Sequence, residues 1–308
     1  MHIRNRYKQG YNFDVLMKAN PSLAPFVKTH YSKLSIDFSN SAAVIELNKA
    51  MLFGDYQLSY WQIPDGYLCP PIPGRVDYIH HLADLLFNTN GNKKPKAKSV
   101  NALDIGTGSS LIYPILGNRE YQWRFVGADI DPISIENSQR IITNNNLTNI
   151  ECRLQPQDIQ CFNGIIKENE RFDITLCNPP FNASSGEAEQ ANKQKWHNLK
   201  QPKSARKSQA ENRNFGGQQA ELYCDGGELK FVRRMINESK HYQQQVLWFS
   251  CLISKKENIR PLKLAMKKAG ALKTKTVTMQ QGQKVSRFIA WTFKNPEQLS
   301  NWCHERFY

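Results

Sequence analysis

The sequence predicts an α/β fold: a mostly parallel, seven-stranded sheet that ends in a C-terminal antiparallel hairpin, with a small helical module at the N-terminus. Three observations lead to this prediction. From Val100 onward, short apolar runs alternate with segments whose apolar residues recur at helical spacing. Two apolar runs near the C-terminus are separated by a short polar connection, which is typical of a hairpin. A glycine-rich turn directly follows the first apolar run, where α/β folds place ligands.

The N-terminal module is expected to comprise residues 1–90, and the α/β domain residues 91–308. Helical spacing marks three segments of the module: 11–18, 42–53 and 75–87. The segment Leu68–Gly74 contains consecutive prolines and is expected to be non-helical, because proline fixes φ and lacks an N–H donor. The polar residues 88–99 are expected to form an exposed connector.

The α/β domain is expected to follow from the alternation of two periodicities. The predicted strands are residues 100–105, 123–129, 150–154, 172–177, 245–251, 272–279 and 284–293. The predicted helices are residues 111–116, 132–146, 227–239 and 255–269. This order gives a mostly parallel sheet with an antiparallel strand at one edge. Rossmann-like methyltransferases have this arrangement, as do many other α/β proteins.

Composition excludes several classes of protein. No run of 18 apolar residues is present and the N-terminus lacks an apolar signal core, so we expect a cytoplasmic protein without a membrane span. The seven cysteines show no CxxC and no zinc spacing, which predicts reduced thiols and no metal site. The net charge of +14 favours a polyanionic partner.

A candidate nucleotide site lies at the end of the first predicted strand. Asp104 precedes Gly106 and Gly108, whose lack of a side chain allows the backbone to turn sharply beside a ligand. A dinucleotide fingerprint would need a third glycine where Leu111 stands. Asp129 ends the next strand, where a carboxylate can accept hydrogen bonds from ribose hydroxyls. These features favour S-adenosylmethionine, which carries an ammonium group and no pyrophosphate.

The tetrapeptide Asn178-Pro179-Pro180-Phe181 directly follows the predicted strand 172–177. The Asn178 side-chain oxygen and the Pro179 carbonyl can each accept one N–H of a planar amine, which favours a tetrahedral nitrogen, and prolines stiffen the turn. Phe181 would stack on a base swung out of its helix. The tetrapeptide alone fits adenine N6, cytosine N4 and a glutamine amide.

Several stretches resemble the large-subunit ribosomal RNA methyltransferase F family and, more distantly, the eukaryotic enzymes that methylate adenine in a spliceosomal small nuclear RNA. The resemblance covers essentially the whole chain. The stretches that carry it are residues 2–7 (HIRNRY), 69–75 (CPPIPGR), 104–108 (DIGTG), 178–181 (NPPF), 214–219 (NFGGQQ) and 286–291 (SRFIAW).

This resemblance implies that the chain methylates adenine N6 in 23S ribosomal RNA, either as naked RNA or in a large-subunit assembly intermediate. It also implies that Arg75 reaches the carboxylate of the methyl donor. By the same resemblance Gly106, Ser110 and Asp129 line the donor pocket, and Asp158 lies near the donor's adenine.

Two basic segments are expected to bind RNA. Arg4, Arg6 and Lys8 surround Tyr7 near the N-terminus, and cations interleaved with aromatic rings suit phosphate contact and base stacking. A long segment at 184–220 lacks periodicity and follows the catalytic tetrapeptide, so we expect a clamp on the RNA. Its basic residues are Lys193, Lys195, Lys200, Lys203, Arg206, Lys207 and Arg213.

Two alternative functions remain open at this point. A protein-glutamine N5 methyltransferase would use a similar tetrapeptide, although the basic segment and Phe181 argue against it. A catalytically idle RNA-binding module would keep the fold as a scaffold, but the intact tetrapeptide beside a complete donor turn disfavours it. Transfer of a labelled methyl group to RNA, to protein or to neither separates the three.

Overall fold

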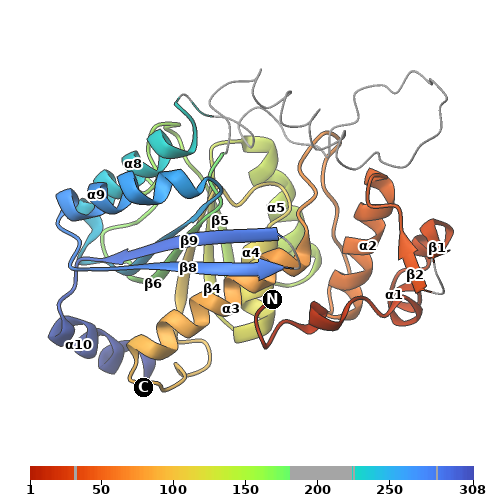
Figure 1. The fold of residues 1–308 in the computed structure, drawn as a ribbon, viewed down its shortest axis with the longest axis horizontal. Coiled ribbons are helices and arrows are strands. Elements are labelled where there is room, and N and C mark those ends of the chain that lie inside the picture. Colours follow the sequence, from red (N-terminus) through yellow and green to blue (C-terminus); the bar gives the residue numbers. More distant parts are fainter. Residues whose placement is uncertain (31–32, 181–223, 225, 282–283) are drawn as a thin grey trace.

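A seven-stranded sheet forms the centre of the protein (Figure 1). The computed structural model describes residues 1–30, 33–180, 224, 226–281 and 284–308. The sheet order is β5-β4-β3-β6-β7-β9-β8. Its strands are β3 (Asn101–Ile105), β4 (Arg124–Asp129), β5 (Ile150–Leu154), β6 (Phe172–Cys177), β7 (Val246–Ile253), β8 (Lys273–Gln281) and β9 (Lys284–Thr292). Strands β5, β4, β3, β6 and β7 pair in parallel, so their carboxyl ends meet at one edge of the sheet.

The antiparallel strand lies one position inside the sheet, and the expectation of an antiparallel edge strand is wrong. Strand β9 pairs antiparallel with both β7 and β8, so β8 forms the edge. The hairpin is also tighter than expected, because Gln280 pairs with Val285 and Gln281 with Lys284. A two-residue connection suffices for an antiparallel pair, and the strands therefore continue to the turn.

Helices cover both faces of the sheet. They are α3 (Ile72–Thr89), α4 (Ile112–Tyr121), α5 (Pro132–Asn144), α8 (Gly227–Ser239), α9 (Ile259–Ala269) and α10 (Pro296–Phe307). Helices α8 and α9 pack together on one side, while α3 contacts α4 and α10 on the other (Figure 1). Successive strand residues enter different cores, as Ala102 and Leu103 do, because strand side chains alternate between faces. None of the helices in the described part of the chain is long and apolar enough to cross a membrane.

The N-terminal elements gather at one side of the molecule (Figure 1). Helices α1 (Phe13–Ala19) and α2 (Ser41–Gly54) match the expected segments, whereas a two-stranded hairpin of β1 (Val27–His30) and β2 (Lys33–Ile36) was not expected. Leu16 and Leu47 belong to the same buried cluster as Leu116 and Trp248 of the α/β domain. The division of the chain at residue 90 therefore stays a prediction.

Helix α3 begins earlier than expected, at Ile72. The expectation that residues 68–74 are non-helical is wrong for its last three residues. Pro71 lies at the N-cap and Pro73 in the first turn, where the missing N–H has no intrahelical partner in any case. Consequently Arg75 lies within the first turns of α3, and this fixed helix carries it toward the carboxyl edge of the sheet.

Candidate active site

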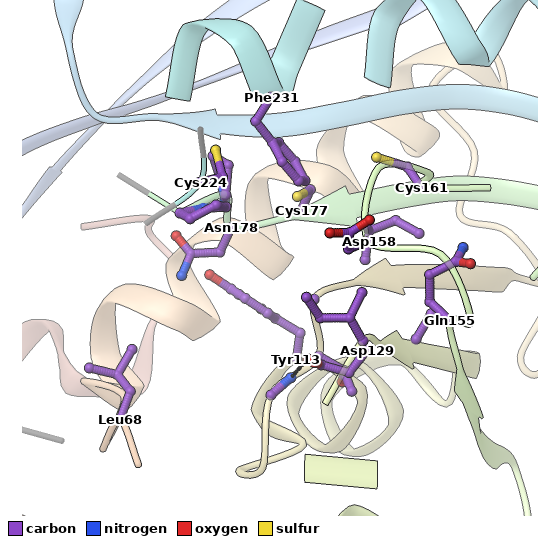
Figure 2. A pocket seen from close by; sticks show the side chains of 18 of the residues that line it. Leu68, Tyr113, Asp129, Gln155, Asp158, Cys161, Cys177, Asn178, Cys224 and Phe231 are labelled. Carbon is purple, nitrogen blue, oxygen red and sulfur yellow. Dashed lines mark hydrogen bonds between the residues drawn. The ribbon is translucent and has the colours of Figure 1, made fainter. Parts of the chain in front are cut away.

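One cavity of about 620 Å³ lies at the carboxyl ends of the parallel strands. It contains nine of the predicted site residues: Arg75, Gly106, Gly108, Ser110, Asp129, Asp158, Asn178, Pro179 and Pro180. Figure 2 shows several of its side chains, among them Phe231, which points from α8 toward Cys177. Phe181 and the basic segment 184–220 lie outside the described residues. The strand ends thus bring together residues that are far apart in the sequence.

The glycine-rich turn is fixed by the neighbouring strand. The N–H groups of Gly106 and Thr107 donate to the Ala128 carbonyl at 2.8 and 3.0 Å, and Gly108 N donates to Asp129 Oδ2 at 2.8 Å. Gly106 has φ +72°, and a Cβ there would meet nothing within 4 Å, so an open cradle lies above the turn. Asp129 Oδ1 accepts the Asp131 N–H at 3.0 Å. Each Asp129 oxygen keeps further acceptor capacity toward the cavity.

Asp104 lies directly behind the residues that line the cavity. Its carboxyl group is fully buried, and neither oxygen has a hydrogen-bond partner of good geometry among the described residues. Burial raises the pKa of Asp104 to about 7; the nearby Thr107 hydroxyl and Arg75 oppose this rise and Asp129 reinforces it. An unpaired buried carboxylate is destabilising, and a cationic group of a ligand would relieve it.

Arg75 is held by a tyrosine that the sequence did not single out. Its Nη1 donates to the Tyr113 hydroxyl at 2.9 Å, and its guanidinium carbon lies 5.5 Å from the centre of the same ring. Burial raises the pKa of Tyr113 to about 12, so the hydroxyl stays neutral. Arg75 Nε is buried without a partner in the described structure, and the guanidinium thus retains donors for an anionic group.

Asn178 directly follows β6 and places a side-chain amide oxygen in the wall of the cavity. Its Oδ1 is buried and has no hydrogen-bond partner among the residues that the structure describes. Pro179 is buried and Pro180 half-buried directly beside it, both in the wall of the cavity. Buried amide oxygens are normally paired, so an orphaned one in a cavity indicates a ligand that donates a hydrogen bond to it.

Two exposed isoleucines flank the outer end of the cavity. Ile130 follows Asp129 at the end of β4, and Ile159 follows Asp158 in the segment after β5; they are 40% and 61% exposed. Apolar side chains at this exposure next to acids suit a planar ring with polar edges. Sequence reasoning missed both, although the repeated Asp-Ile pair after neighbouring strands was a usable signal.

Other lining residues could not be found from the sequence. Gln155, Cys161, Cys177, Cys224, Phe231 and Arg234 face the cavity only because of how the segments pack. The N-terminal module contributes Leu68 and Pro70. It also supports the donor turn, since Trp61 Nε1 donates to the Ser110 carbonyl at 2.9 Å and Tyr67 donates to Asp131 at 2.7 Å.

The N-terminal arginines have partners within the protein. Arg4 pairs with Asp84, and Arg6 pairs with Glu120 at 2.9 Å, while each guanidinium also lies over a tyrosine ring. Lys8 is exposed. Both arginine side chains remain about two-fifths exposed, and their contact with RNA stays a prediction.

One group of side chains in the described structure has a composition that could hold a metal ion: His2, His81 and Asp84. The Arg4 N–H donates to His2 Nδ1 at 3.1 Å, so the proton of a neutral ring lies on Nε2. That Nε2–H donates to Asp84 at 2.8 Å. This tautomer leaves His2 no free lone pair for a metal, and Arg4 already neutralises Asp84. The arrangement is better described as an ion-pair cluster that holds the N-terminus on α3.

The fold and the cavity define a class I methyltransferase: a donor turn after the first parallel strand, an acid after the second, and an Asn-Pro-Pro turn after the fourth in sequence order. S-adenosylmethionine is the methyl donor of this class. A sequence profile described as RNA methyltransferase matches residues 1–295. The chain belongs to the ribosomal RNA large subunit methyltransferase F family, as its similarity to curated members shows.

Two of these relatives illustrate the similarity. The family member of Colwellia psychrerythraea is 54% identical over 297 residues, which cover 95% of this chain and 99% of the relative. That of Pseudomonas fluorescens is 46% identical over 309 residues, covering 100% of this chain and 90% of the relative.

Solved structures extend the similarity to a human protein. The catalytic domain of human METTL16, in complex with hairpin 1 of the MAT2A 3′ untranslated region, has a TM-score of 0.78 and 29% identity, with 96% of each chain covered. The N-terminal domain of human METTL16 in complex with SAH has a TM-score of 0.74 and 28% identity, covering 96% of this chain and 99% of that one.

Proposed function

We propose that this protein transfers a methyl group from S-adenosylmethionine to the exocyclic N6 of one adenine in 23S ribosomal RNA. The single observation that carries the proposal is the buried Asn178 Oδ1 in the wall of the cavity, which has no hydrogen-bond partner within the described ranges of the chain. An amide oxygen at this place would accept a hydrogen bond from an N–H of a planar amine and leave one face of the amine open toward the methyl donor. Ribosomal RNA as substrate also implies a cytoplasmic location.

The donor fits the unsatisfied polar groups of the cavity. Arg75 would bind its carboxylate and Asp104 would stabilise its ammonium group, which gives the buried carboxylate a counter-charge. Asp129 would accept the two ribose hydroxyls, and Asp158 would accept from the adenine amine. The isoleucines at 130 and 159 would flank the adenine ring. When bound, the donor supplies an electrophilic methyl group on a sulfonium.

The catalytic turn would prepare the acceptor amine. Asn178 Oδ1 accepts one N–H and the Pro179 carbonyl accepts the other, which draws the nitrogen lone pair out of conjugation with the ring. The proline pair keeps the two acceptors at a fixed separation. Phe181, which follows the described residues, would stack on the flipped base. After transfer the nitrogen would release one proton to solvent water and regain a neutral planar amine.

The net charge of the protein and its similarity to curated relatives support RNA as the substrate. The curated relatives carry the name ribosomal RNA large subunit methyltransferase F, and the human structural neighbour is recorded with an RNA hairpin. The net charge of +14 suits phosphate binding. Contacts would come from Arg4, Arg6 and Lys8 and from the basic segment 184–220, on naked RNA or on a large-subunit assembly intermediate.

Mass mapping of nucleosides tests the proposal. Unmethylated 23S RNA and assembly particles are each incubated with the protein and donor, and N6-methyladenosine is located. Asn178→Ala should lower the rate about 100-fold or more, with the donor dissociation constant changed only a few-fold, because one positioned acceptor is lost. The matched control Asn301→Ala, on the exposed side of α10, should retain full activity.

The outcome also decides between the alternatives. Full activity of Asn178→Ala would remove the assigned role of the side chain. Methyl label in protein and none in RNA would favour a protein-glutamine methyltransferase. Donor binding without transfer to either would favour the idle RNA-binding module.

A further inference from the structure

The C-terminal half of β6 is joined to β7 by side chains in place of a regular backbone ladder. The register of these parallel strands pairs Ile174 with Trp248. Its continuation would pair Leu176 with Ser250, and the N–H of Ser250 would then donate to the Thr175 carbonyl. Instead, the Ser250 N–H donates to Thr175 Oγ1 at 3.4 Å, and Ser250 Oγ donates to the Thr175 carbonyl at 2.5 Å. The end of β6 pairs with β3 through Cys177 on one side. On the β7 side it is held by one serine hydroxyl just before the catalytic turn.

Tyr78 completes this cross-link from helix α3. Its hydroxyl lies 2.7 Å from Ser250 Oγ. Because a carbonyl only accepts, the single proton of Ser250 Oγ is committed to Thr175, and Tyr78 must be the donor to Ser250. All three side chains are fully buried, and burial raises the pKa of Tyr78 well above its ordinary value, so the donor keeps its proton. The direction of both hydrogen bonds is thus fixed.

The same face of α3 also contacts the donor side of the cavity. Arg75 and Tyr78 are three residues apart and therefore share a helix face. Tyr113 lies between them: its hydroxyl accepts from Arg75, and its ring meets the ring of Tyr78 edge-on, with centroids 5.7 Å apart. One helix thus supports both the group expected to bind the donor carboxylate and the strand that carries Asn178.

We propose that Tyr78 is a positioning residue for methyl transfer. Through Ser250 it holds the Thr175 carbonyl and, with it, the end of β6. The Asn178 oxygen, three residues further along the chain, consequently stays at the place of the reacting amine. The proposal rests on the role given above to Asn178. It makes no demand on which planar amine is methylated.

The test is Tyr78→Phe, which removes one hydroxyl and keeps the ring. Displacement of a reacting group by a fraction of an ångström can cost about 10- to 100-fold in rate. We expect kcat to fall at least about tenfold, with the donor dissociation constant and KM changed less than about twofold. Active sites are counted by bound donor, so that a smaller folded fraction does not lower the measured kcat.

Tyr121→Phe is the matched control. It removes a partly buried hydroxyl from the same side of the sheet, where Tyr121 pairs with His80 at 2.7 Å outside the cavity, and kcat should stay unchanged. Ser250→Ala should reproduce the loss of kcat. In that background Tyr78→Phe should add less than about twofold, because Tyr78 acts through Ser250.

Unchanged kcat in Tyr78→Phe, an equal loss in Tyr121→Phe, or multiplicative losses in the double variant would each overturn the proposal. If the wild-type protein methylates no RNA, the proposed function fails. Hydrogen exchange then tests separately whether Tyr78 holds the end of β6. The Ser250 amide and the amides of Leu176 and Cys177 should exchange faster in Tyr78→Phe than in Tyr121→Phe. Equal exchange in the two variants would show that Tyr78 does not hold the strand.

Discussion

Several single residues at and behind the glycine-rich turn are in states that cost stability in the protein without a ligand. Asp104 is fully buried without a good hydrogen bond, and Arg75 keeps a buried Nε without a partner in the described structure. Leu111, where a dinucleotide site would have glycine, adopts φ +52° and is fully buried. A left-handed leucine costs about 1 kcal/mol or more, and such strain is typical of functional sites.

The raised pKa of Asp104 makes stability depend on pH. Burial raises this pKa to about 7, so the folded protein holds the proton more tightly than the unfolded chain does. The stabilisation from the protonated group is complete below the unfolded pKa of about 4 and is lost as the pH rises through about 7. Asp104→Asn keeps a neutral side chain, and its melting temperature relative to wild type should be higher at about pH 8 than at about pH 5.5.

Ionisation of Asp104 should strengthen binding of the methyl donor although it destabilises the fold. At about pH 8 the ionised Asp104 would stabilise the donor ammonium, and Asp104→Asn should weaken donor binding measured by calorimetry although it stabilises the fold. Exposed Asp65→Asn serves as the control and should behave alike at both pH values. A pH-independent difference in melting temperature for Asp104→Asn would contradict the assigned protonation.

At the scale of elements, helix α8 positions the loop that follows β5. The Glu238 carboxylate accepts the backbone N–H groups of Cys161, Phe162 and Asn163 at 2.7–2.8 Å. Three fixed points shortly after Asp158 restrict the loop that forms the outer end of the cavity. A mutation in α8 can therefore change donor affinity without touching the donor.

Glu238→Ala should leave these three backbone donors without their acceptor. We expect the free energy of unfolding to fall by about 1–3 kcal/mol and the donor dissociation constant to rise several-fold, because the loop is less ordered. Chemical denaturation and calorimetry measure the two effects. The control Glu305→Ala breaks an exposed ion pair with Arg171 and should change stability by less than about 1 kcal/mol. A stability loss without any change in donor affinity would show that the loop position does not depend on Glu238.

The sequence predicted the elements that have strong periodicity and missed those that lack it. The predicted bounds of β5, β6 and α8 coincide with the observed ones. Strands β1 and β2 have four residues each, and the alternation of Leu34 and Ile36 with polar residues in β2 is too short to predict a strand, so tertiary packing specifies them. Helix α10 was missed although Asn295 and Gln298 form a capping box and Leu299, Trp302 and Phe307 share a buried face. That signal was present in the sequence.

The candidate site was predictable where chain order determines position. Asp129 ends β4 and Asn178 directly follows β6, and the carboxyl ends of these parallel strands must meet. The supporting tyrosines were not predictable, because Tyr113 meets Arg75 only through the packing of α3 against α4. Asp104 is a mixed case: its place at the strand end was predicted, and its complete burial behind the turn was not.

For the molecule as a whole, charge is the property most relevant to the substrate. The net charge is +14, and the basic residues between 193 and 213 that are predicted to bind RNA follow the tetrapeptide 178–181 in the sequence. Internal carboxylates already compensate Arg4 and Arg6. Their removal would therefore affect both RNA affinity and the docking of the N-terminus.

Neutralising Lys193, Lys195, Lys200 and Lys203 to glutamine should weaken RNA binding and flatten its salt dependence. If each lysine contacts one phosphate, the slope of log affinity against log salt should decrease by about 3, which corresponds to four released counterions. Binding titrations at several salt concentrations measure the slope. A matched control variant has glutamine at the four connector lysines 93, 94, 96 and 98, which precede β3 at the amino ends of the parallel strands. Equal slopes for the first variant and the wild type would remove the basic segment from the RNA interface.

The two edge strands of the sheet have a consequence for the protein's behaviour at high concentration. On β5, Arg153 is bound between Glu151 and Glu170, and the other edge strand, β8, contains Lys273 and Lys275. A second sheet that approached either edge would have to bury these charges, which discourages edge-to-edge stacking. Replacing Lys273 and Lys275 by threonine would create an uncharged, β-prone ribbon, and concentrated stocks should then become turbid on storage while the catalytic cavity remains intact.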